Sequence, residues 1–402
     1  GELSLDGRIT AIDGALPMVI SMRNKTFKKV IVPEDNKEEC GAIEGIDIIP
    51  VGSISQLVSY LNEELAIDPF IYKYDFSLKQ DYYSEDFSEI KGQPAMKRAV
   101  EIAAAGMHNI LLLGSPGSGK TMIAKRIPTI LPDLTFEESL EVTKIYSICG
   151  LLDKKGLMAK RPFRSPHHTS SRTSMAGGGS KPRPGEVSLS HYGVLFLDEI
   201  PEFPKNVIEV LRQPMEDGKI SISRASGSFT FPAKFMMIAS MNPCPCGYLG
   251  DPNHECSCSQ GQIDKYLGKI SGPLLNRIDI QIEVLPVKYN ELKDERVEET
   301  SEEIKKRIVK ARNIQRERYK DMGILTNSEL STKAVSKFCK VNKESEVLLK
   351  NAFELLGLSV RAYNKILKVA RTIADLENYE NIETKHIAEA IQYRNLDRKY
   401  WR

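Results

Sequence analysis

The sequence predicts an α/β protein with a parallel αβα sandwich at its centre and an all-helical C-terminal part. Between residues 92 and about 284, short apolar runs alternate with helical segments and glycine-rich turns, the pattern of a parallel sheet with helices on both faces. One of these runs, Ile110–Leu113, passes directly into a glycine-rich turn and then a helical segment. From about residue 289 onward the chain has few glycines and no proline, so we expect helices there.

Composition and charge exclude several classes of protein. The chain has 402 residues, enough for two or three domains of about 150 residues each. It is 41% hydrophobic and 27% charged, which excludes collagen, coiled-coil and largely disordered proteins. With 56 Lys and Arg against 54 Asp and Glu the net charge is +2, so any contact with DNA must be local. No apolar run is long enough to span a bilayer and no leader precedes the fold, so we expect a cytoplasmic protein without membrane contact.

Changes in composition divide the chain into four parts. Residues 1–66 mix short β-like runs, at 30–33 and 46–51, with helical stretches and predict a small α/β domain. Residues 67–91 are rich in aromatic and acidic residues without periodicity, which indicates a linker. We expect the sandwich over residues 92–288 and the helical part over residues 289–402.

The glycine-rich turn after Ile110–Leu113 has the spacing GxxxxGK[ST] that binds nucleotide phosphates. Its glycines let backbone N–H groups surround the phosphates, and the N-terminus of the following helix adds positive potential. Lys120 is expected to contact the β- and γ-phosphates of ATP or GTP, and the Thr121 hydroxyl to bind Mg²⁺. The residues of this phosphate loop are Gly114, Ser115, Pro116, Gly117, Ser118, Gly119, Lys120 and Thr121.

Two further strand ends supply polar groups for hydrolysis. Val194–Leu197 ends in Asp198, expected to hold Mg²⁺ through water, and Glu199, expected to be the general base on the attacking water. The alternative is a pair of acids that caps the next helix. A third strand, at 234–240, is expected between the other two. Asn242 at its end would orient the water against the γ-phosphate, the alternative being a turn residue.

Four of the seven cysteines lie between residues 244 and 258, as two closely spaced pairs in a loop of Gly, Asp, Pro and Asn. Cys244, Cys246, Cys256 and Cys258 have the number and grouping that a tetrahedral Zn²⁺ site needs, although CxC is tighter than the usual CxxC. Four thiolates leave no open position for water, so the zinc would be structural. A redox pair and incidental cysteines are the alternatives, and His254 is a second candidate for one ligand position.

Longer motifs resemble the magnesium-chelatase-like AAA+ ATPases, and among them the ComM/YifB group. They read FRSPHHTSSRTSMAGGGSKPRPGEVSLSHYGVLFLDEIPEFPKNVIEVLRQPMEDGKI, NPCPCGYLGDP, CSCS and KISGPLLNRIDIQIEV, and the resemblance covers nearly the whole chain. It implies a AAA+ phosphate-loop fold with a C-terminal helical lid. It also implies a ring-forming, hexameric DNA motor that uses ATP for helicase activity and branch migration of recombination intermediates during natural transformation, with recombination proteins as further partners.

The resemblance also implies roles for individual residues. Arg277, in SGPLLNRID, matches the arginine finger that reaches the γ-phosphate on a neighbouring subunit, the alternative being an ion pair with Asp279 or a helix-end carboxylate. Gln93 joins the nucleotide-binding candidates. Arg361 matches the lid arginine that senses the γ-phosphate. Independently, Ser359 is the expected N-cap of a helix, which puts Arg361 in the first turn, where a cation opposes the helix dipole.

The N-terminal part resembles the second half of a Lon-protease-like (S5-like) domain, in GELSLDGRITAIDGALPMVISMRNKTFKKVIVPEDN. We expect the half that carries the protease serine to lie upstream of Gly1, and Leu16 stands where a Lon-type lysine would. The resemblance therefore implies an incomplete, non-proteolytic platform.

Two segments are candidates for contact with single-stranded or branched DNA. Residues 166–184 combine basic side chains with Ser, Thr and Gly and contain no acid, which suits contacts to phosphates without sequence preference. Residues 219–231 alternate like a hairpin. The DNA candidates are Lys181, Arg183 and Arg224, and a solvated surface loop is the alternative for each.

Three other functions share parts of this pattern. A chelatase-type subunit would drive metal insertion into a porphyrin, but in the related families the cysteine cluster and the Lon-like part belong to the DNA motors. A protein-remodelling ATPase would carry an aromatic–Gly pore dipeptide of the unfoldase kind, and we find none of that kind after Asp133. An enhancer-binding transcriptional activator would carry a GAFTGA loop, which the sequence lacks. The expected function is therefore an ATP-hydrolysing DNA motor.

Overall fold

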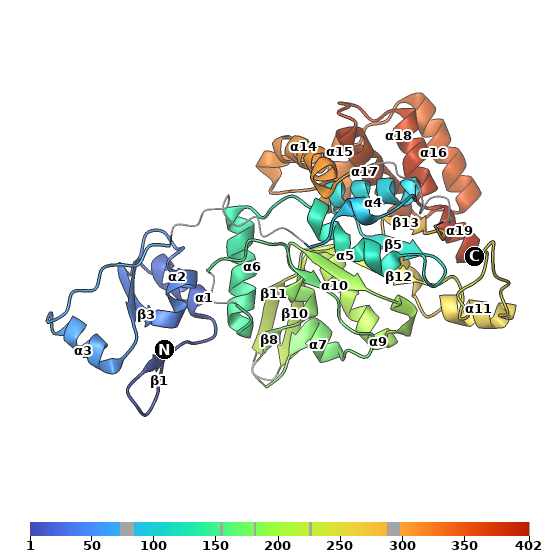
Figure 1. Cartoon of the computed structure of the whole chain (residues 1–402). Helices are drawn as coiled ribbons and strands as arrows, with labels where there is room; N and C mark the ends of the chain where they lie inside the picture. The colour runs from blue at the N-terminus through green and yellow to red at the C-terminus, as the bar shows by residue number, and fades with distance from the viewer. Residues whose placement is uncertain (73–83, 153–155, 181, 225–226, 288–297, 402) are drawn as a thin grey trace.

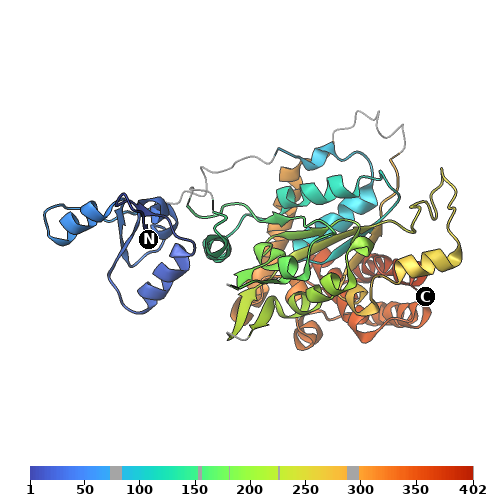
Figure 2. The same ribbon diagram turned by 90° about the horizontal axis from the view of Figure 1, so that it is seen from below.

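The computed structural model describes residues 1–72, 84–152, 156–180, 182–224, 227–287 and 298–401. It contains a small N-terminal unit, a central sheet with helices on both faces, and a group of C-terminal helices (Figure 1). The N-terminal unit lies to one side of the other two parts in both Figure 1 and Figure 2. The predicted α/β class, with a parallel sheet and a helical C-terminal region, is confirmed.

The N-terminal unit packs two parallel strands against short helices. Strand β3 (Lys29–Pro33) pairs with β4 (Asp47–Val51), close to the two positions where the sequence predicts strands. The other elements are β1 (Glu2–Leu3), β2 (Ile9–Thr10), α1 (Ala15–Asn24), α2 (Lys37–Cys40) and α3 (Ile54–Leu61). Leu16, at the position where a Lon-type lysine would stand, is fully buried in the core of this unit.

Five parallel strands form the central sheet in the order β13–β5–β12–β9–β6. Their bounds are β5 (Ile110–Leu113), β6 (Phe163–Arg164), β9 (Val194–Leu197), β12 (Met236–Met241) and β13 (Ile280–Glu283). Every residue of β5, β9 and β12 is buried because both faces of the sheet are covered. Strand β12 lies between β5 and β9, as predicted. It begins later than expected because Lys234 hydrogen-bonds to the turn before β9.

Alternating side chains of the strands face two separate cores, as the period of two in a strand requires. Ile110 and Leu112 face a core shared with α4 (Pro94–Gly106), α5 (Lys120–Ile130) and the C-terminal helices. Leu111 and Leu113 face the other core. Helices α9 (Lys205–Ile208), α11 (Gln260–Leu267) and α12 (Gly272–Leu275) contribute to that second core.

Most C-terminal helices pack on the same face of the sheet as α4 and α5, whereas the last, with Leu396 and Tyr400, contributes to the other core (Figure 1). The C-terminal helices are α14 (Ser301–Tyr319), α15 (Thr332–Phe338), α16 (Lys343–Leu356), α17 (Val360–Leu376), α18 (Thr384–Gln392) and α19 (Asn395–Tyr400). Inside this group the fully buried Asp375 accepts hydrogen bonds from Arg318 at 2.6 and 3.0 Å, Arg371 at 3.2 Å and Asn327 at 2.8 Å. One carboxylate therefore joins α14, α17 and the segment between α14 and α15.

Helix α6 (Phe136–Cys149) lies between the N-terminal unit and the central sheet (Figure 1). The backbone N–H of Gly14 donates to the Ser147 carbonyl oxygen at 2.9 Å, so α1 and α6 are in direct contact. Helices α7 (Arg172–Ala176), α8 (Glu186–Leu189) and α10 (Arg212–Asp217) complete this side of the molecule. In the part of the chain that the structure describes, no helix has the length and hydrophobicity to cross a membrane.

We predict that Asp375→Ala lowers the free energy of unfolding by about 3–5 kcal/mol, because it leaves two buried guanidinium groups without their counter-charge. Urea denaturation followed by circular dichroism measures this change. The control is Glu354→Ala, which removes an exposed carboxylate on α16 and should change the free energy by less than about 0.5 kcal/mol. Equal costs for the two variants would contradict the prediction.

Candidate nucleotide site and cysteine cluster

The phosphate loop connects β5 to α5 at the carboxyl edge of the sheet. Gly117 and Gly119 have φ angles of +78° and +91°, in the left-handed region that favours glycine, and Gly119 is the N-cap of α5. A Cβ on Gly114 would lie 2.3 Å from the Val284 carbonyl oxygen, so only glycine fits where the loop leaves β5. The loop therefore brings the free backbone N–H groups at the start of α5 to the place where phosphates bind.

Lys120 bridges the phosphate loop and the end of β12. Its Nζ donates to the carbonyl oxygens of Gly114 at 2.7 Å and Ser115 at 2.9 Å, and to Asn242 Oδ1 at 3.1 Å. Burial lowers the pKa of Lys120, and the charge of Asp198 opposes that shift. Only neutral oxygens hold the ammonium group among the described residues, so its charge remains available for a phosphate.

Thr121 and Asp198 meet through their oxygens. Thr121 Oγ1 donates to Asp198 Oδ2 at 3.0 Å, and Ser240 Oγ donates to Asp198 Oδ1 at 2.5 Å. The Glu199 N–H donates to the same Ser240 hydroxyl at 3.0 Å, and the φ of Glu199 is +52°. A non-glycine residue in this region is strained, and such strain is concentrated at functional sites. A hydroxyl and a carboxylate at adjoining positions are ligands that Mg²⁺ uses, so these residues fit that ion.

Two buried polar atoms beside the loop, Ser118 Oγ and Gln93 Oε1, have no hydrogen-bond partner among the described residues. Gln93 is fixed by its amide nitrogen, which donates to the carbonyl oxygens of Ser118 at 3.2 Å and Leu285 at 3.0 Å. Buried polar atoms normally have partners. The unpaired atoms therefore fit a site that receives a polar ligand such as a nucleotide.

Arg277 and Arg361 lie together on a different part of the chain. Arg277 pairs with Glu216 at 2.6 Å and Arg361 with the same carboxylate at 3.7 Å. Both line one cavity, and no residue of the phosphate loop lines it. Of the two ion pairs considered for Arg277, the structure has the helix-end carboxylate, since Glu216 lies in the last turn of α10, whereas Asp279 pairs with Lys365.

Helix α17 begins as the sequence predicts. The Ser359 side chain accepts a hydrogen bond from the Ala362 N–H at 3.2 Å, which makes it the N-cap and puts Arg361 in the first turn, with its side chain 63% exposed. One turn further on, Lys365 Nζ donates to the Arg277 carbonyl oxygen at 2.9 Å. The helix that carries Arg361 therefore also fixes the backbone that carries Arg277.

The four cysteine sulfurs form one cluster in which all Sγ atoms lie within 4.8 Å of one another. The Cys244 and Cys246 sulfurs are 3.3 Å apart, and each is 3.6 Å from the Cys256 sulfur. Four sulfurs bound to one tetrahedral zinc lie about 3.8 Å apart, whereas a disulfide requires about 2.05 Å. A hydrogen bond from the Tyr248 N–H lowers the pKa of Cys246 to about 6, which favours a thiolate at this sulfur, whereas burial raises the pKa of Cys244. The geometry fits zinc.

The cysteine loop packs against the phosphate loop. A Cβ on Gly247 would lie 2.5 Å from Pro116 Cδ, and the Asp251 carboxylate is hydrogen-bonded to the Ser115 side chain. His254 is 3.4 Å from Asp251 Oδ1 and stacks on Tyr248, outside the group of four sulfurs. The sequence spacing predicts the group of four cysteines, but only the fold shows that their loop contacts the phosphate loop.

The DNA candidates differ in how much of them the structure describes. Lys181 and the tip of the hairpin between β10 (Lys219–Arg224) and β11 (Gly227–Pro232) lie outside the described residues, and of Arg224 only the backbone is described. Arg183 pairs with Asp13 of the N-terminal unit at 3.0 Å. The segment expected as one loop over 166–184 contains α7 and a short ladder of β7 (Gly177–Gly178) with β8 (Arg183–Pro184), and Gly177 lies against Ile222 of the hairpin.

Sequence reasoning missed two polar residues that organise the site. Ser240 is fully buried and bonds both Asp198 and the Glu199 backbone. Asn109 accepts from the Met237 N–H at 2.8 Å and donates through Nδ2 to the Arg277 carbonyl oxygen at 3.2 Å. The sequence carries a signal for both residues, because Ser240 is a polar residue near the end of an apolar strand and Asn109 is a polar residue directly before one.

A parallel sheet with a phosphate loop after β5, acids after β9 and an amide after the strand between them defines a phosphate-loop nucleotide-binding protein of the α/β class. Three models of magnesium chelatase match the chain: subunit ChlI over residues 86–292, the ChlI C-terminal region over 298–394, and a further ChlI model over 1–36. The chain belongs to the magnesium chelatase ChlI family.

Two curated relatives match almost the whole chain. The uncharacterized protein YifB of Escherichia coli is 40% identical over 99% of this chain and 77% of its own length. The competence protein ComM of Haemophilus influenzae has the same identity and coverage. A magnesium-chelatase 38 kDa subunit of Cereibacter sphaeroides is 22% identical over 39% of this chain and 52% of its own length. The protein is therefore a magnesium-chelatase-like ATPase of the ComM/YifB group, as the sequence motifs predict.

We predict that the purified chain binds about one equivalent of Zn²⁺ and that Cys244→Ser with Cys256→Ser abolishes this binding. Because the cysteine loop contacts Pro116 and Ser115, the double variant should also bind nucleotide several-fold more weakly. Elemental analysis and titration with a fluorescent ATP analogue measure the two effects. Cys149→Ser, outside the cluster, is the control and should change neither. A zinc-free protein with full nucleotide affinity would contradict the prediction.

Proposed function

We propose that this chain is an ATP-driven DNA motor that assembles as a hexameric ring. The observation that carries the proposal is the meeting of Lys120, Thr121, Asp198 and Asn242 at the carboxyl ends of three parallel strands. The full-length similarity to a competence protein supports DNA as the partner. We expect the motor to work in the cytoplasm on recombination intermediates, by helicase activity and branch migration.

The proposed hydrolysis assigns one task to each group. Lys120 binds the β- and γ-phosphates, while Thr121 directly and Asp198 through water hold Mg²⁺, which neutralises charge that develops on the phosphates. Glu199 accepts a proton from the attacking water, and Asn242 orients that water in line with the γ-phosphate. Ser240 fixes this arrangement, since it bonds the Asp198 carboxylate and the Glu199 backbone together.

Assembly follows from the separation of the arginines from the phosphate loop. Arg277 and Arg361 line a cavity that contains no phosphate-loop residue, so we propose that they act on the nucleotide of a neighbouring copy. In the single chain both pair with Glu216, and a γ-phosphate would compete for them with its higher charge. An interface of this head-to-tail kind forms a ring when the rotation between neighbouring copies closes, and a ring is what we propose.

DNA contact is proposed for the two adjoining insertions. The hairpin of β10 and β11 buries Ile220 and Ile222 against the core, while most of β11 is exposed. Lys181 and Arg224 would bind phosphates there. Arg183 would do so only after it leaves Asp13, so the N-terminal unit competes with DNA for it. Contacts of this kind are to the backbone of DNA and carry little sequence preference.

A chelatase-type subunit or a protein-remodelling ATPase is the alternative. The similarity to a magnesium-chelatase subunit is much lower and covers less of the chain than that to the competence protein, which favours the DNA motor. In the N-terminal unit, the buried Leu16 cannot supply the charge of a catalytic lysine, so we propose a platform without peptidase activity.

We predict that single-stranded, forked or four-way-junction DNA stimulates steady-state ATP hydrolysis several-fold, because a motor couples turnover to its track. Lys120→Ala should abolish the activity, since it removes the cation at the phosphates. The matched control is Lys125→Ala, an exposed lysine on the same helix, which should leave the rate unchanged. A Lys120-dependent rate that no DNA alters would contradict the motor and favour the alternatives.

We predict that two variants that are inactive alone, Glu199→Gln and Arg277→Ala, recover ATP hydrolysis when they are mixed. In a randomly mixed ring, about one quarter of the neighbouring pairs combine an intact phosphate-loop half with an intact arginine, so the rate should reach about one quarter of the normal rate. The intact arginine of the first variant then completes the intact phosphate loop of the second. A mixture of Glu199→Gln with Lys120→Ala is the control and should stay inactive, since both changes damage the same half of the site. No recovery in the first mixture would exclude action between copies.

A further inference from the structure

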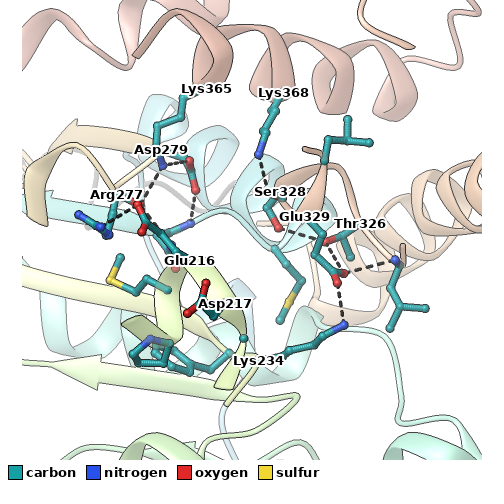
Figure 3. Close-up of a pocket in the computed structure, with 18 of the residues that line it drawn as sticks. Glu216, Asp217, Lys234, Arg277, Asp279, Thr326, Ser328, Glu329, Lys365 and Lys368 are labelled. Carbon is teal, nitrogen blue, oxygen red and sulfur yellow. Dashed lines mark hydrogen bonds and ion pairs between the residues drawn. The ribbon is translucent and has the colours of Figure 1, made fainter. Parts of the chain in front are cut away.

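A cavity of about 620 Å³ separates the central sheet from the C-terminal helices (Figure 3). We propose that it is a second anion site, which binds a small phosphate-bearing ligand at Arg312 and Lys368. Figure 3 shows Arg277 and Glu216 at one side of the cavity and Lys368, Ser328 and Glu329 at the other. The inference concerns the second side; Arg277 and Arg361, which the proposed function uses, line the same cavity but take no part in this inference.

Most cations that line the cavity already have a counter-charge. Arg161 pairs with Glu138 at 2.8 Å, and Lys234 pairs with Glu329 at 2.8 Å. Lys365 pairs with Asp279, and the two arginines described above share Glu216. These pairs account for their charges and need no ligand.

Arg312 and Lys368 are different, because neither forms an ion pair in the described part of the chain. The Arg312 side chain comes from α14, and the residue is only 9% exposed. It donates one hydrogen bond, from Nη2 to the Ala104 carbonyl oxygen at 3.2 Å, and its Nε has no partner. Lys368, on α17, donates only to the Ser328 carbonyl oxygen at 2.9 Å. The cavity wall therefore carries two positive charges, from two helices in contact, that form no direct ion pair with a described carboxylate, although Asp217 also lines the cavity.

An unpaired buried charge is costly, so its presence in a cavity that can hold a ligand points to binding. Burial lowers the pKa of Arg312 to about 9 and also lowers the pKa of Lys368. An anion placed between the two would oppose both shifts, because its negative charge stabilises the protonated forms. Without a ligand, these two buried charges lower the stability of the fold.

Phosphate fits this wall better than other anions. A guanidinium group binds two phosphate oxygens at once, and an ammonium group adds a point charge. Hydroxyl groups of Ser331 and Thr332 also line the cavity and can donate to phosphate oxygens. Its volume is that of a small-molecule site, so the ligand is a free or nucleotide-borne phosphate and not a DNA duplex.

The test uses Lys120→Ala protein, in which the phosphate loop is disabled. Calorimetric titration with inorganic pyrophosphate, in metal-free buffer at constant ionic strength, should detect one binding event per chain. Lys368→Gln and Arg312→Gln, each added to this protein, should weaken the affinity about tenfold or more. Lys350→Gln, an exposed lysine on α16, is the matched control and should have no effect. Parallel titrations with orthophosphate and ADP distinguish a free phosphate from a nucleotide.

Thermal melting separates binding from a structural role. Without ligand, the protein with Arg312→Gln added should melt at or above the temperature of Lys120→Ala protein, because the change removes an unpaired buried charge. Pyrophosphate should raise the melting temperature of Lys120→Ala protein but not that of the protein that also carries Arg312→Gln. If Arg312→Gln does not fold, Lys368→Gln decides alone. The proposal is overturned if Lys120→Ala protein binds no pyrophosphate, if Lys368→Gln binds it normally, or if sulfate binds equally well. It is also overturned if these variants only reduce self-association, since the anion would then be a carboxylate of a second copy.

Discussion

The nucleotide site depends on the parallel register of β5, β12 and β9. Leu113 pairs with Met241, and Leu197 pairs with Ala239, so the three strands end at the same edge of the sheet. The residues that follow them therefore meet, although they are far apart in the sequence. Ser240, inside β12, then ties the acids of the β9 end to the middle of the site. A change in this register would move the carboxylates that follow β9 away from the lysine and the hydroxyl that follow β5.

The same sheet also connects the nucleotide site with the arginines that face away from it. Asn109, at the start of β5, bonds the first part of β12 and the carbonyl oxygen of Arg277. Lys365 bonds that carbonyl oxygen from α17. The arginine segment is therefore held from the sheet and from the C-terminal helices at once. A movement of α17 relative to the sheet would therefore change the position of Arg277.

Buried charge is distributed unevenly in the C-terminal helices. Around Asp375, Arg318 and Arg371 both pair with the one carboxylate, which joins three segments into one body. At the cavity beside α14 and α17, Arg312 and Lys368 are not compensated. The first arrangement stabilises the fold and the second does not, because a buried charge without a partner retains its cost of desolvation. Stability and ligand binding thus occupy neighbouring parts of the same helices.

The sequence by itself determined the α/β class, the helical C-terminal part, the phosphate loop, the four clustered cysteines and the N-cap at Ser359, since each follows from local pattern or spacing. Motif resemblance added the family. Tertiary structure alone decided that the cysteine loop supports Pro116, that Ser240 and Asn109 organise the site, and that Arg277 and Arg361 share Glu216 away from the phosphate loop. These are contacts between residues distant in sequence, and their geometry depends on how strands and helices pack, which no local pattern encodes.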